Sequence, residues 1–345
     1  MPRPLLSSLS ALACAALAAC AGAEPAPAAP GAPWVSEHAR DHPLAGRVWQ
    51  PAEGRFVEAE AVVAALAAAR FVLLGEKHDN ADHHRIQAWL LARLIARGRR
   101  LAVTFEMFTS EQEPALAAHL AVNPKDAAGI GPALGWAETG WPDWTLYQPI
   151  AQAALDGGAP VLAANLPRET IHALAREGVA ALGAGRTAAL GLDRPLPAEL
   201  AALLRREIFE SHCGQLPDSM IGPMVTVMTA RDAHMAEVLV RSAATGDRDA
   251  AVLIAGTGHS RADHGVRFHL RRFEPEARIV SLGLVEVIEA ANQPAAYAER
   301  FGVDVIPFDF VWFTPVADPE DPCARFADQL RRARERYEKE TRSTE

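Results

Sequence analysis

The sequence predicts an α/β fold: a mostly parallel sheet covered by helices, with a smaller, mainly helical subdomain. Three observations predict it. Short apolar segments recur along the chain, helical patterns separate them, and the stretch from 168 to 250 is helical in pattern almost throughout. Strands that are apolar on both faces are typical of parallel sheets, because helices cover both sides of such a sheet.

Six apolar segments are the expected strands, and each ends at glycine or polar residues. They are 71–74, 101–105, 160–164, 251–255, 278–287 and 308–313. Residues 81–97 repeat apolar side chains at helical spacing and predict the helix after the first strand. Either Asp79 or Asn80 can cap the start of this helix, and Gly98 can end it.

Composition excludes one class of partner. The chain has 345 residues and a net charge of −9, with no extended basic segment. Phosphate binding needs clustered lysine and arginine, so we expect no nucleic acid partner.

The N-terminal residues predict export. Residues 1–19 carry the basic Arg3 and then an apolar stretch too short to cross a membrane and stop there, which indicates a signal peptide. They are followed by Cys20, and the sequence Leu-Ala-Ala-Cys resembles a bacterial lipobox. We therefore expect Cys20 to be acylated, for instance by palmitate, and to begin the mature lipoprotein. A hydrophobic N-terminal helix is the alternative. Because no Asp follows Cys20, the resemblance implies a lipid anchor in the cell envelope, at the outer membrane.

The rest of the chain divides by composition. Residues 20–36 form a Pro/Ala-rich tether, and residues 37–330 form the α/β domain with a helical insertion at about 168–250. Residues 331–345 are a charged C-terminal tail.

Export also decides how the four cysteines are interpreted. Removal of the signal peptide with Cys14, and acylation of Cys20, leave Cys213 and Cys323. In an oxidising compartment this favours a disulfide between these two residues over two free thiols. A metal site would need more ligands at closer spacing.

Polar side chains follow four of the expected strands at the point where each strand ends. Glu76 and His78 follow the first, Glu106 the second, Asn165 the third, and His259 the fourth. In open α/β sheets, ligands bind at the carboxyl ends of the strands. We therefore expect Glu76, His78, Glu106 and His259 to line one pocket.

Each of these residues has an alternative interpretation. Glu76 and His78, two residues apart on extended chain, point to the same side, which suits metal ligation or a histidine oriented by a carboxylate. In the alternative, Asp79 caps the helix, and His83 and His84 only cover its first turn.

Glu106 and His259 also have two interpretations each. A buried carboxylate at Glu106 needs a cation, a histidine or a metal, and an ion pair with Arg231 would also satisfy it. Around His259, Gly256 and Gly258 match a dinucleotide-binding fingerprint poorly, and the glycines more readily allow a tight turn that exposes the imidazole.

The segment 135–149 concentrates aromatic side chains, including Trp136, Trp141, Trp144 and Tyr147. With its glycines and prolines it predicts a structured loop. It can form a flat wall for a planar ligand, with Tyr147 as an iron ligand, or a packed small core.

Eight segments together resemble one family. They are VLLGEKHDNADHHRIQ, FEMF, WPDWTLYQP, AANLPR, HCGQLP, RDAHMAE, LIAGTGHSRADHGV and FDFVWFTP, in this order between residues 40 and 320. The order is similar to that of the ChaN-like haem-binding uptake family of bacterial lipoproteins, within the wider group of TraB/Tiki-type and erythromycin-esterase-like proteins. The resemblance implies haem b held without a covalent bond, a homodimer around the haem, and a haem-uptake machinery as partner. No CxxCH attachment motif is present.

The resemblance also implies site residues. Tyrosinate ligates haem iron in the family, and Tyr147 lies in a matched segment whereas Tyr297 and Tyr337 do not. The implied haem-binding residues are Tyr147, Trp144, His78 and His259.

Two other functions stay open. Tiki-type relatives use a Gly-x-x-His element, matched here by Gly75 to His78, in a metal-dependent peptidase site. A divalent metal held by His78, Glu106 and His259, with Glu76 beside it, would make the chain a metal-dependent hydrolase. A non-catalytic interaction module is the third possibility. The resemblance favours haem binding without catalysis.

Overall fold

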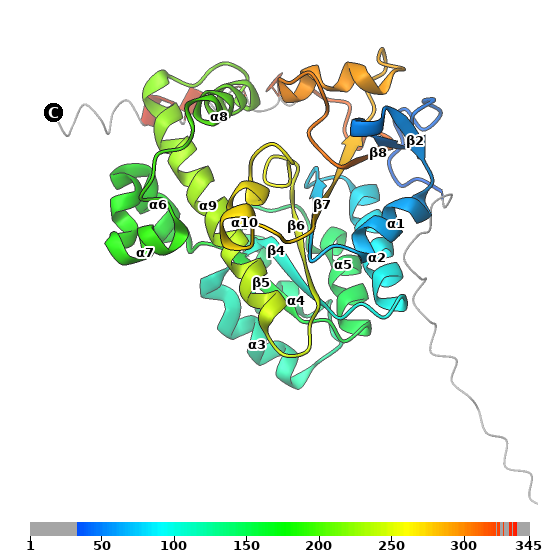
Figure 1. Ribbon diagram of the computed structural model, residues 1–345, viewed down its shortest axis with the longest axis horizontal. Coiled ribbons are helices and arrows are strands. Elements are labelled where there is room, and N and C mark those ends of the chain that lie inside the picture. Colours follow the sequence, from blue (N-terminus) through cyan, green and yellow to red (C-terminus); the bar gives the residue numbers. More distant parts are fainter. Residues whose placement is uncertain (1–32, 322, 325–326, 328–330, 333, 337–345) are drawn as a thin grey trace, which may run out of the picture.

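The computed structural model (Figure 1) describes residues 33–321, 323–324, 327, 331–332 and 334–336. The expected signal peptide, Cys20 and Tyr337 lie outside the described residues. Within the described part of the chain, no helix has the length and apolar character needed to cross a membrane.

One eight-stranded sheet organises the fold, in the order β2-β1-β8-β7-β3-β6-β4-β5. The strands from β8 to β5 in this order pair in parallel. Their bounds are β3 (Phe71–Glu76), β4 (Leu101–Thr109), β5 (Val161–Asn165), β6 (Ala250–Gly256), β7 (Ile279–Glu286) and β8 (Phe310–Thr314). The predicted mostly parallel sheet, with its six strands, is confirmed.

Two strands were not expected. β1 (Val48–Gln50) and β2 (Arg55–Val57) extend the sheet in antiparallel orientation beyond β8. Each has three residues, and most of them are partly exposed, so neither forms a continuous apolar run. Trp49 and Phe56 pack edge to face across this hairpin, with ring centroids 4.9 Å apart.

Helices cover both faces of the sheet, as Figure 1 shows. Along β3, Val72 and Leu74 point to one face and pack with α1, α2 and α5, while Phe71 and Leu73 point to the other and pack with α9 and α10. The α-helices are α1 (Ala59–Ala67), α2 (Ala81–Ala96), α3 (Glu113–Val122), α4 (Ile130–Ala133), α5 (Trp144–Asp156), α6 (Arg168–Glu177), α7 (Gly183–Leu190), α8 (Ala198–Ser211), α9 (Asp218–Ala244) and α10 (Val266–Phe273). The 3-10 helices are η1 (Pro51–Glu53), η2 (Ser110–Gln112), η3 (Trp136–Glu138), η4 (Gly178–Leu182), η5 (Pro294–Tyr297) and η6 (Glu299–Phe301).

The helix α2 begins at a side-chain cap. The Asn80 side chain accepts hydrogen bonds from the backbone N–H groups of Asp82 and His83, so Asn80, and not Asp79, caps the helix. Gly98 follows the end of α2 with a φ of +80°, a left-handed conformation that glycine adopts without strain.

The smaller helical part consists of α6, α7, α8 and the first half of α9. Ile208 of α8 and Ile221 of α9 share one small buried cluster there, separate from the cores on the sheet. A disulfide joins Cys213, in the turn between α8 and α9, to Cys323 near the C-terminus. The predicted cysteine pairing is thus present in the structure.

The aromatic segment 135–149 differs from the expected loop. After η3, the Asp143 side chain accepts the backbone N–H of Thr145 and caps α5, which begins at Trp144. Trp144 and Tyr147 are three residues apart and buried, so they lie on one helix face. The sequence analysis predicted a loop because glycine and proline usually interrupt helices, whereas Pro149 lies inside α5.

Candidate functional site

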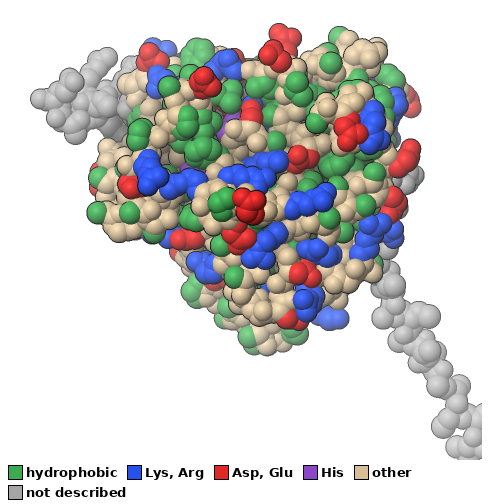
Figure 2. Space-filling view, viewed as in Figure 1, with side chains coloured by type: hydrophobic (Ala, Val, Ile, Leu, Met, Phe, Trp, Pro, Cys, Tyr) green, Lys and Arg blue, Asp and Glu red, His purple; other side chains and the backbone are tan. Residues whose placement is uncertain are grey.

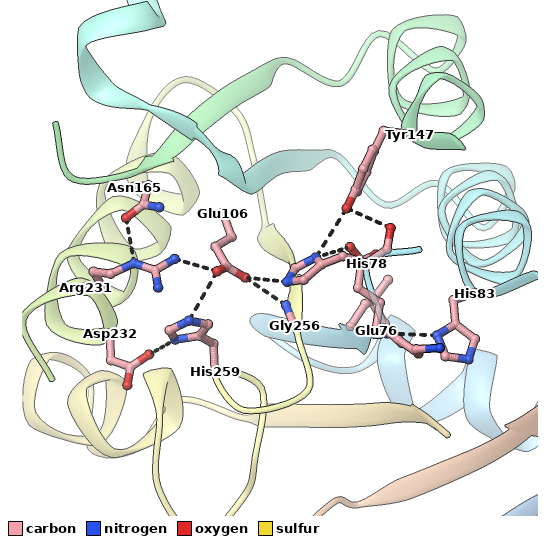
Figure 3. A network of polar contacts seen from close by, with 12 residues as sticks. Glu76, His78, His83, Glu106, Tyr147, Asn165, Arg231, Asp232, Gly256 and His259 are labelled. Atoms are coloured by element: carbon pink, nitrogen blue, oxygen red, sulfur yellow. Dashed lines mark hydrogen bonds and ion pairs between the residues drawn. The ribbon is translucent and has the colours of Figure 1, made fainter. Parts of the chain in front are cut away.

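Three adjacent strands bring the expected polar residues together. Glu76 ends β3, Glu106 lies inside β4, and His259 follows β6, while β3 and β4 are the two neighbours of β6. Glu106 was expected just after its strand, but β4 continues to Thr109. Figure 3 shows the side chains of Glu76, His78, Glu106 and His259 meeting in one network at this edge of the sheet.

Glu76 orients His78. The Glu76 Oε1 atom lies 3.0 Å from His78 Nδ1, and Oε2 lies 3.2 Å from Nε2 of His84. Burial by itself would raise the pKa of Glu76, but the two histidines lower it to about 2. Glu76 is therefore ionised at neutral pH although it is only 1% exposed.

Glu106 is the centre of the network. Its Oε1 accepts a hydrogen bond from Nη2 of Arg231 and lies 3.2 Å from Nε2 of His259. Its Oε2 accepts the backbone N–H of Gly256 at 2.8 Å and lies 3.9 Å from His78 Nε2. Burial would raise the pKa of Glu106, yet His259 and Arg231 hold it well below its usual value. The ion pair with Arg231, one of the two interpretations of this carboxylate, is present.

His259 is held between two carboxylates. Its Nδ1 lies 2.6 Å from Oδ1 of Asp232, opposite the contact with Glu106. Burial would lower its pKa, but Glu106 and Asp232 raise it to about 9. Both ring nitrogens therefore carry protons at neutral pH, and each donates to a carboxylate. Asp232 was not among the candidates, although its place beside Arg231 on α9 was a usable signal.

Asn165 and Gly256 hold two further members of the network, Arg231 and His78, in position. Arg231 Nε donates to Oδ1 of Asn165 at 3.1 Å, so the residue that ends β5 joins the cluster as well. A Cβ atom at Gly256 would lie 2.9 Å from His78 Nε2. A larger residue here would push the His78 imidazole out of its place, because the imidazole passes directly against the backbone.

His78 is the member of the quartet Glu76, His78, Glu106 and His259 that solvent reaches most easily. Its side chain is 29% exposed, against 10% or less for the other three. Trp141 packs edge-on against it, with ring centroids 4.8 Å apart. Burial would lower the pKa of His78, but its hydrogen bond to Glu76 and the charge of Glu106 raise it. The arrangement suits holding and moving a proton at His78.

Figure 2 shows acidic, basic and hydrophobic side chains interspersed over one face of the molecule.

Tyr147 lies behind His78 and not at the surface. Its ring is 0% exposed, and its hydroxyl lies 3.2 Å from both Nδ1 and the carbonyl oxygen of His78. Burial, with the charges of Glu76 and Glu106, raises its pKa above the ordinary value. Tyr147 as the ligand of haem iron stays a prediction.

The remaining sequence candidates have structural partners. Trp144 donates its indole N–H to the carbonyl of Ala127 inside the core. Tyr297 is 0% exposed, and its hydroxyl oxygen accepts a hydrogen bond from the backbone N–H of Ile288. The Nδ1 atom of His83 accepts the backbone N–H of Lys77, so His83 stabilises the first turn of α2.

Among the described residues, no group of three or more His, Cys, Asp or Glu side chains is arranged to hold a metal ion. Glu106 illustrates the reason. Both of its oxygens already accept hydrogen bonds, from Arg231 and from the backbone N–H of Gly256.

One comparison with a solved structure agrees with this architecture. The structure of the ChaN protein of Campylobacter jejuni, determined with cofacial haem, superposes with a TM-score of 0.58 and 21% identity, over 77% of this chain and 95% of that one. A type III effector, HopBA1, and an erythromycin esterase variant, EreC, both at 13% identity, give TM-scores of 0.39 and 0.40. They cover 74% and 76% of this chain, and 91% and 94% of their own. The search of curated proteins gave no match.

A sequence model settles the family. The model described as "Haem-binding uptake, Tiki superfamily, ChaN" matches residues 62–270 of the 345, which is more than half of the chain. This span contains Glu76, His78, Glu106 and His259 and most of the helices on both faces of the sheet. The chain therefore belongs to the haem-binding uptake family of ChaN, in the Tiki superfamily.

Proposed function

We propose that this protein binds haem without a covalent bond and takes part in haem and iron uptake. Membership of the haem-binding uptake family carries the proposal. The solved ChaN of Campylobacter jejuni is described with cofacial haem, which supports the same ligand here. The cysteines agree with non-covalent binding of haem b, since Cys213 and Cys323 are joined to each other and no CxxCH motif is present.

The proposal includes export and a lipid anchor. The Cys213–Cys323 disulfide supports it, because such bonds persist in oxidising compartments. We propose that acylated Cys20 holds the protein at the outer membrane, where haem would be passed to the uptake machinery. Cys20→Ser should remove palmitate labelling and release the protein from the membrane fraction. Full retention of the variant with outer membrane would contradict the anchor.

A homodimer around haem is part of the same proposal. The purified protein should change from monomer to dimer when haem is added, measured by light scattering coupled to gel filtration. An unchanged mass with haem bound would contradict the dimer and leave haem binding intact.

A metal-dependent hydrolase is the second candidate, and one observation favours it. His78 is accessible, and Glu76 and Glu106 lie beside its two ring nitrogens. The described donors oppose a metal, because Glu106 is already engaged by Arg231 and His259. Metal analysis of the purified protein tests this directly. Stoichiometric zinc or manganese that is lost in His78→Ala would establish the metal site.

The experiment that tests the main proposal is a titration of the full chain, purified in detergent, with ferric haem. We expect a saturable shift of the Soret band at one haem per chain. A band identical to that of haem in detergent alone, at every protein concentration, would refute haem binding.

A further inference from the structure

A cavity of about 370 Å³ lies outside the Glu106 network, between α9, α10 and the connection from α7 to α8. The helix α10 packs along α9, as Figure 1 shows. Each helix turns one face to the cavity, because the lining residues lie one turn apart: Val225 and Thr229 on α9, and Phe268 and Arg272 on α10. The volume is in the lower part of the range for small-molecule sites.

The wall of the cavity is mainly apolar. Leu192, Leu196 and Phe268 contribute to it, and Pro195 and Pro197 stiffen the α7–α8 connection. Such a wall suits an apolar, flat ligand body, since aromatic rings pack well against one another.

The two threonines of the wall add little polar character. The Thr226 hydroxyl donates to the carbonyl of Gly222 at 3.3 Å, and the Thr229 hydroxyl donates to the carbonyl of Val225 at 2.7 Å. Both donors are thus engaged within α9. A ligand rich in hydroxyl groups, such as a sugar, would find few partners here.

His269 is the buried polar group of the wall. It is 3% exposed, and its Nδ1 atom has no hydrogen-bond partner among the described residues. Phe268 packs edge-on against the imidazole, with ring centroids 5.1 Å apart. Burial lowers the pKa of His269 to about 4, so the imidazole is neutral at pH 7. Buried polar atoms usually have a partner, so this nitrogen favours a ligand that supplies one neutral hydrogen-bonding group.

Two cations also line the cavity. Arg194 and Arg272 are exposed, whereas His269 is buried, so the charges lie nearer the opening and the imidazole lies deeper. None of the wall residues that the structure describes carries a carboxylate. The charge of the wall therefore favours an anion at the opening.

Arg272 is held in position before any ligand arrives. Its Nη1 donates to the carbonyls of Leu190 and Gly191. Gly191 has a φ of +66°, and a Cβ atom there would overlap the guanidinium. Glycine at this position thus leaves the space that the guanidinium occupies.

We propose that this cavity binds a small phenolic acid, that is, a carboxylic acid whose aromatic body carries a hydroxyl group at its far end. The carboxylate pairs with Arg194 and Arg272, the ring lies against the apolar wall, and the hydroxyl bonds to Nδ1 of His269. A phenol hydroxyl can donate and accept, so it suits either neutral tautomer of the imidazole. This site is separate from that of haem, which under the proposed function lies between two protomers.

The test uses the full chain in detergent, without haem, and two probes that differ by one oxygen atom. They are para-hydroxyphenylpropanoate and phenylpropanoate. Titration calorimetry measures the affinity of each, after subtraction of the heat of adding the probe to detergent alone. We expect one probe per chain, with the hydroxylated probe bound about fivefold more tightly, because only this probe reaches His269 with a hydrogen bond.

His269→Leu removes the hydrogen-bonding nitrogen and keeps an apolar side chain. The variant should bind the two probes with equal affinity, within about twofold. The matched control is His172→Leu, at an exposed histidine of α6, which should keep the fivefold preference. A preference that survives in His269→Leu would overturn the proposal.

A second variant does not depend on repacking a buried position. Arg194→Glu reverses a charge at the opening and should weaken the binding of both probes about tenfold, while its haem titration stays like that of wild type. Arg176→Glu reverses a charge on α6, where the side chain is 67% exposed, and should change neither measurement.

The outcomes separate this proposal from the proposed function. Wild type that binds haem but neither probe overturns the cavity assignment alone. Wild type that binds the probes as expected but no haem overturns the proposed function alone. An Arg194→Glu variant that loses haem and both probes together would show that the cavity belongs to the haem site, and would overturn a separate ligand.

Discussion

Removing the negative charge of Asp232 should change how the stability of this protein depends on pH. In the structure, Asp232 and Glu106 hold His259 between them and raise its pKa to about 9, from an ordinary value near 6.5. A group whose pKa is raised on folding stabilises the fold below its unfolded pKa, and this contribution is lost as pH rises through the folded pKa. His259 should therefore stabilise the protein fully below pH 6.5 and lose this effect up to about pH 9.

The magnitude follows from the same pair of values. A pKa difference of one unit corresponds to about 1.4 kcal/mol, so the free energy of unfolding should fall by about 3 kcal/mol between pH 6.5 and 9. Asp232→Asn removes one of the two carboxylates but keeps the shape of the side chain. We expect this variant to be about 1–3 kcal/mol less stable at pH 6.5 and to lose less stability on going to pH 9.

Urea unfolding at a series of pH values, followed by tryptophan fluorescence, measures both quantities. Asp247→Asn is the matched control, because Asp247 is 78% exposed and pairs only with the exposed Arg100 among its described partners. Equal pH profiles for Asp232→Asn and wild type would refute the reasoning. So would a wild-type stability that rises between pH 6.5 and 9.

Three further predictions concern the disulfide, the buried tyrosine and the central ion pair. Changing Cys213 and Cys323 to serine should lower the free energy of unfolding by about 2–5 kcal/mol, measured by urea unfolding, and thiol labelling of the unfolded, unreduced wild type should find neither cysteine free. Tyr147→Phe removes the hydroxyl beside His78 and should cost about 1 kcal/mol and shift the ferric haem spectrum; an unchanged spectrum would contradict Tyr147 as iron ligand. Arg231→Met leaves the carboxylate of Glu106 without its cation and should cost about 3–5 kcal/mol at pH 7, and a loss below 1 kcal/mol would show that the pair is dispensable.

The sheet and the place of the candidate site could be predicted because both depend on local patterns. Continuous apolar runs identified β3 to β8, and the rule that the carboxyl ends of parallel strands meet at one edge is enough to bring Glu76, Glu106 and His259 together. The short hairpin of β1 and β2 has no such pattern, since its residues gain their order by pairing with β8. The start of α5 was missed because a cap at Asp143 outweighed a composition rich in glycine and proline.

The partners of each side chain could not be predicted in the same way. Asp232 reaches His259 only because α9 packs across the sheet, and the two residues are 27 positions apart in sequence. Tyr147 was expected to face a ligand, whereas the packing of α5 against α2 turns it inward, where its ring lies 4.3 Å from that of His84.

The position of the iron tests the central claim most directly. Anomalous diffraction at the iron edge from crystals of the protein with haem would locate it without reference to the surrounding density. We predict one ordered iron per chain, at the centre of a haem that lies between two protomers. An iron at His78 between Glu76 and Glu106, with no haem around it, would contradict this account, and crystals with haem but no ordered iron on any side chain would contradict specific haem binding.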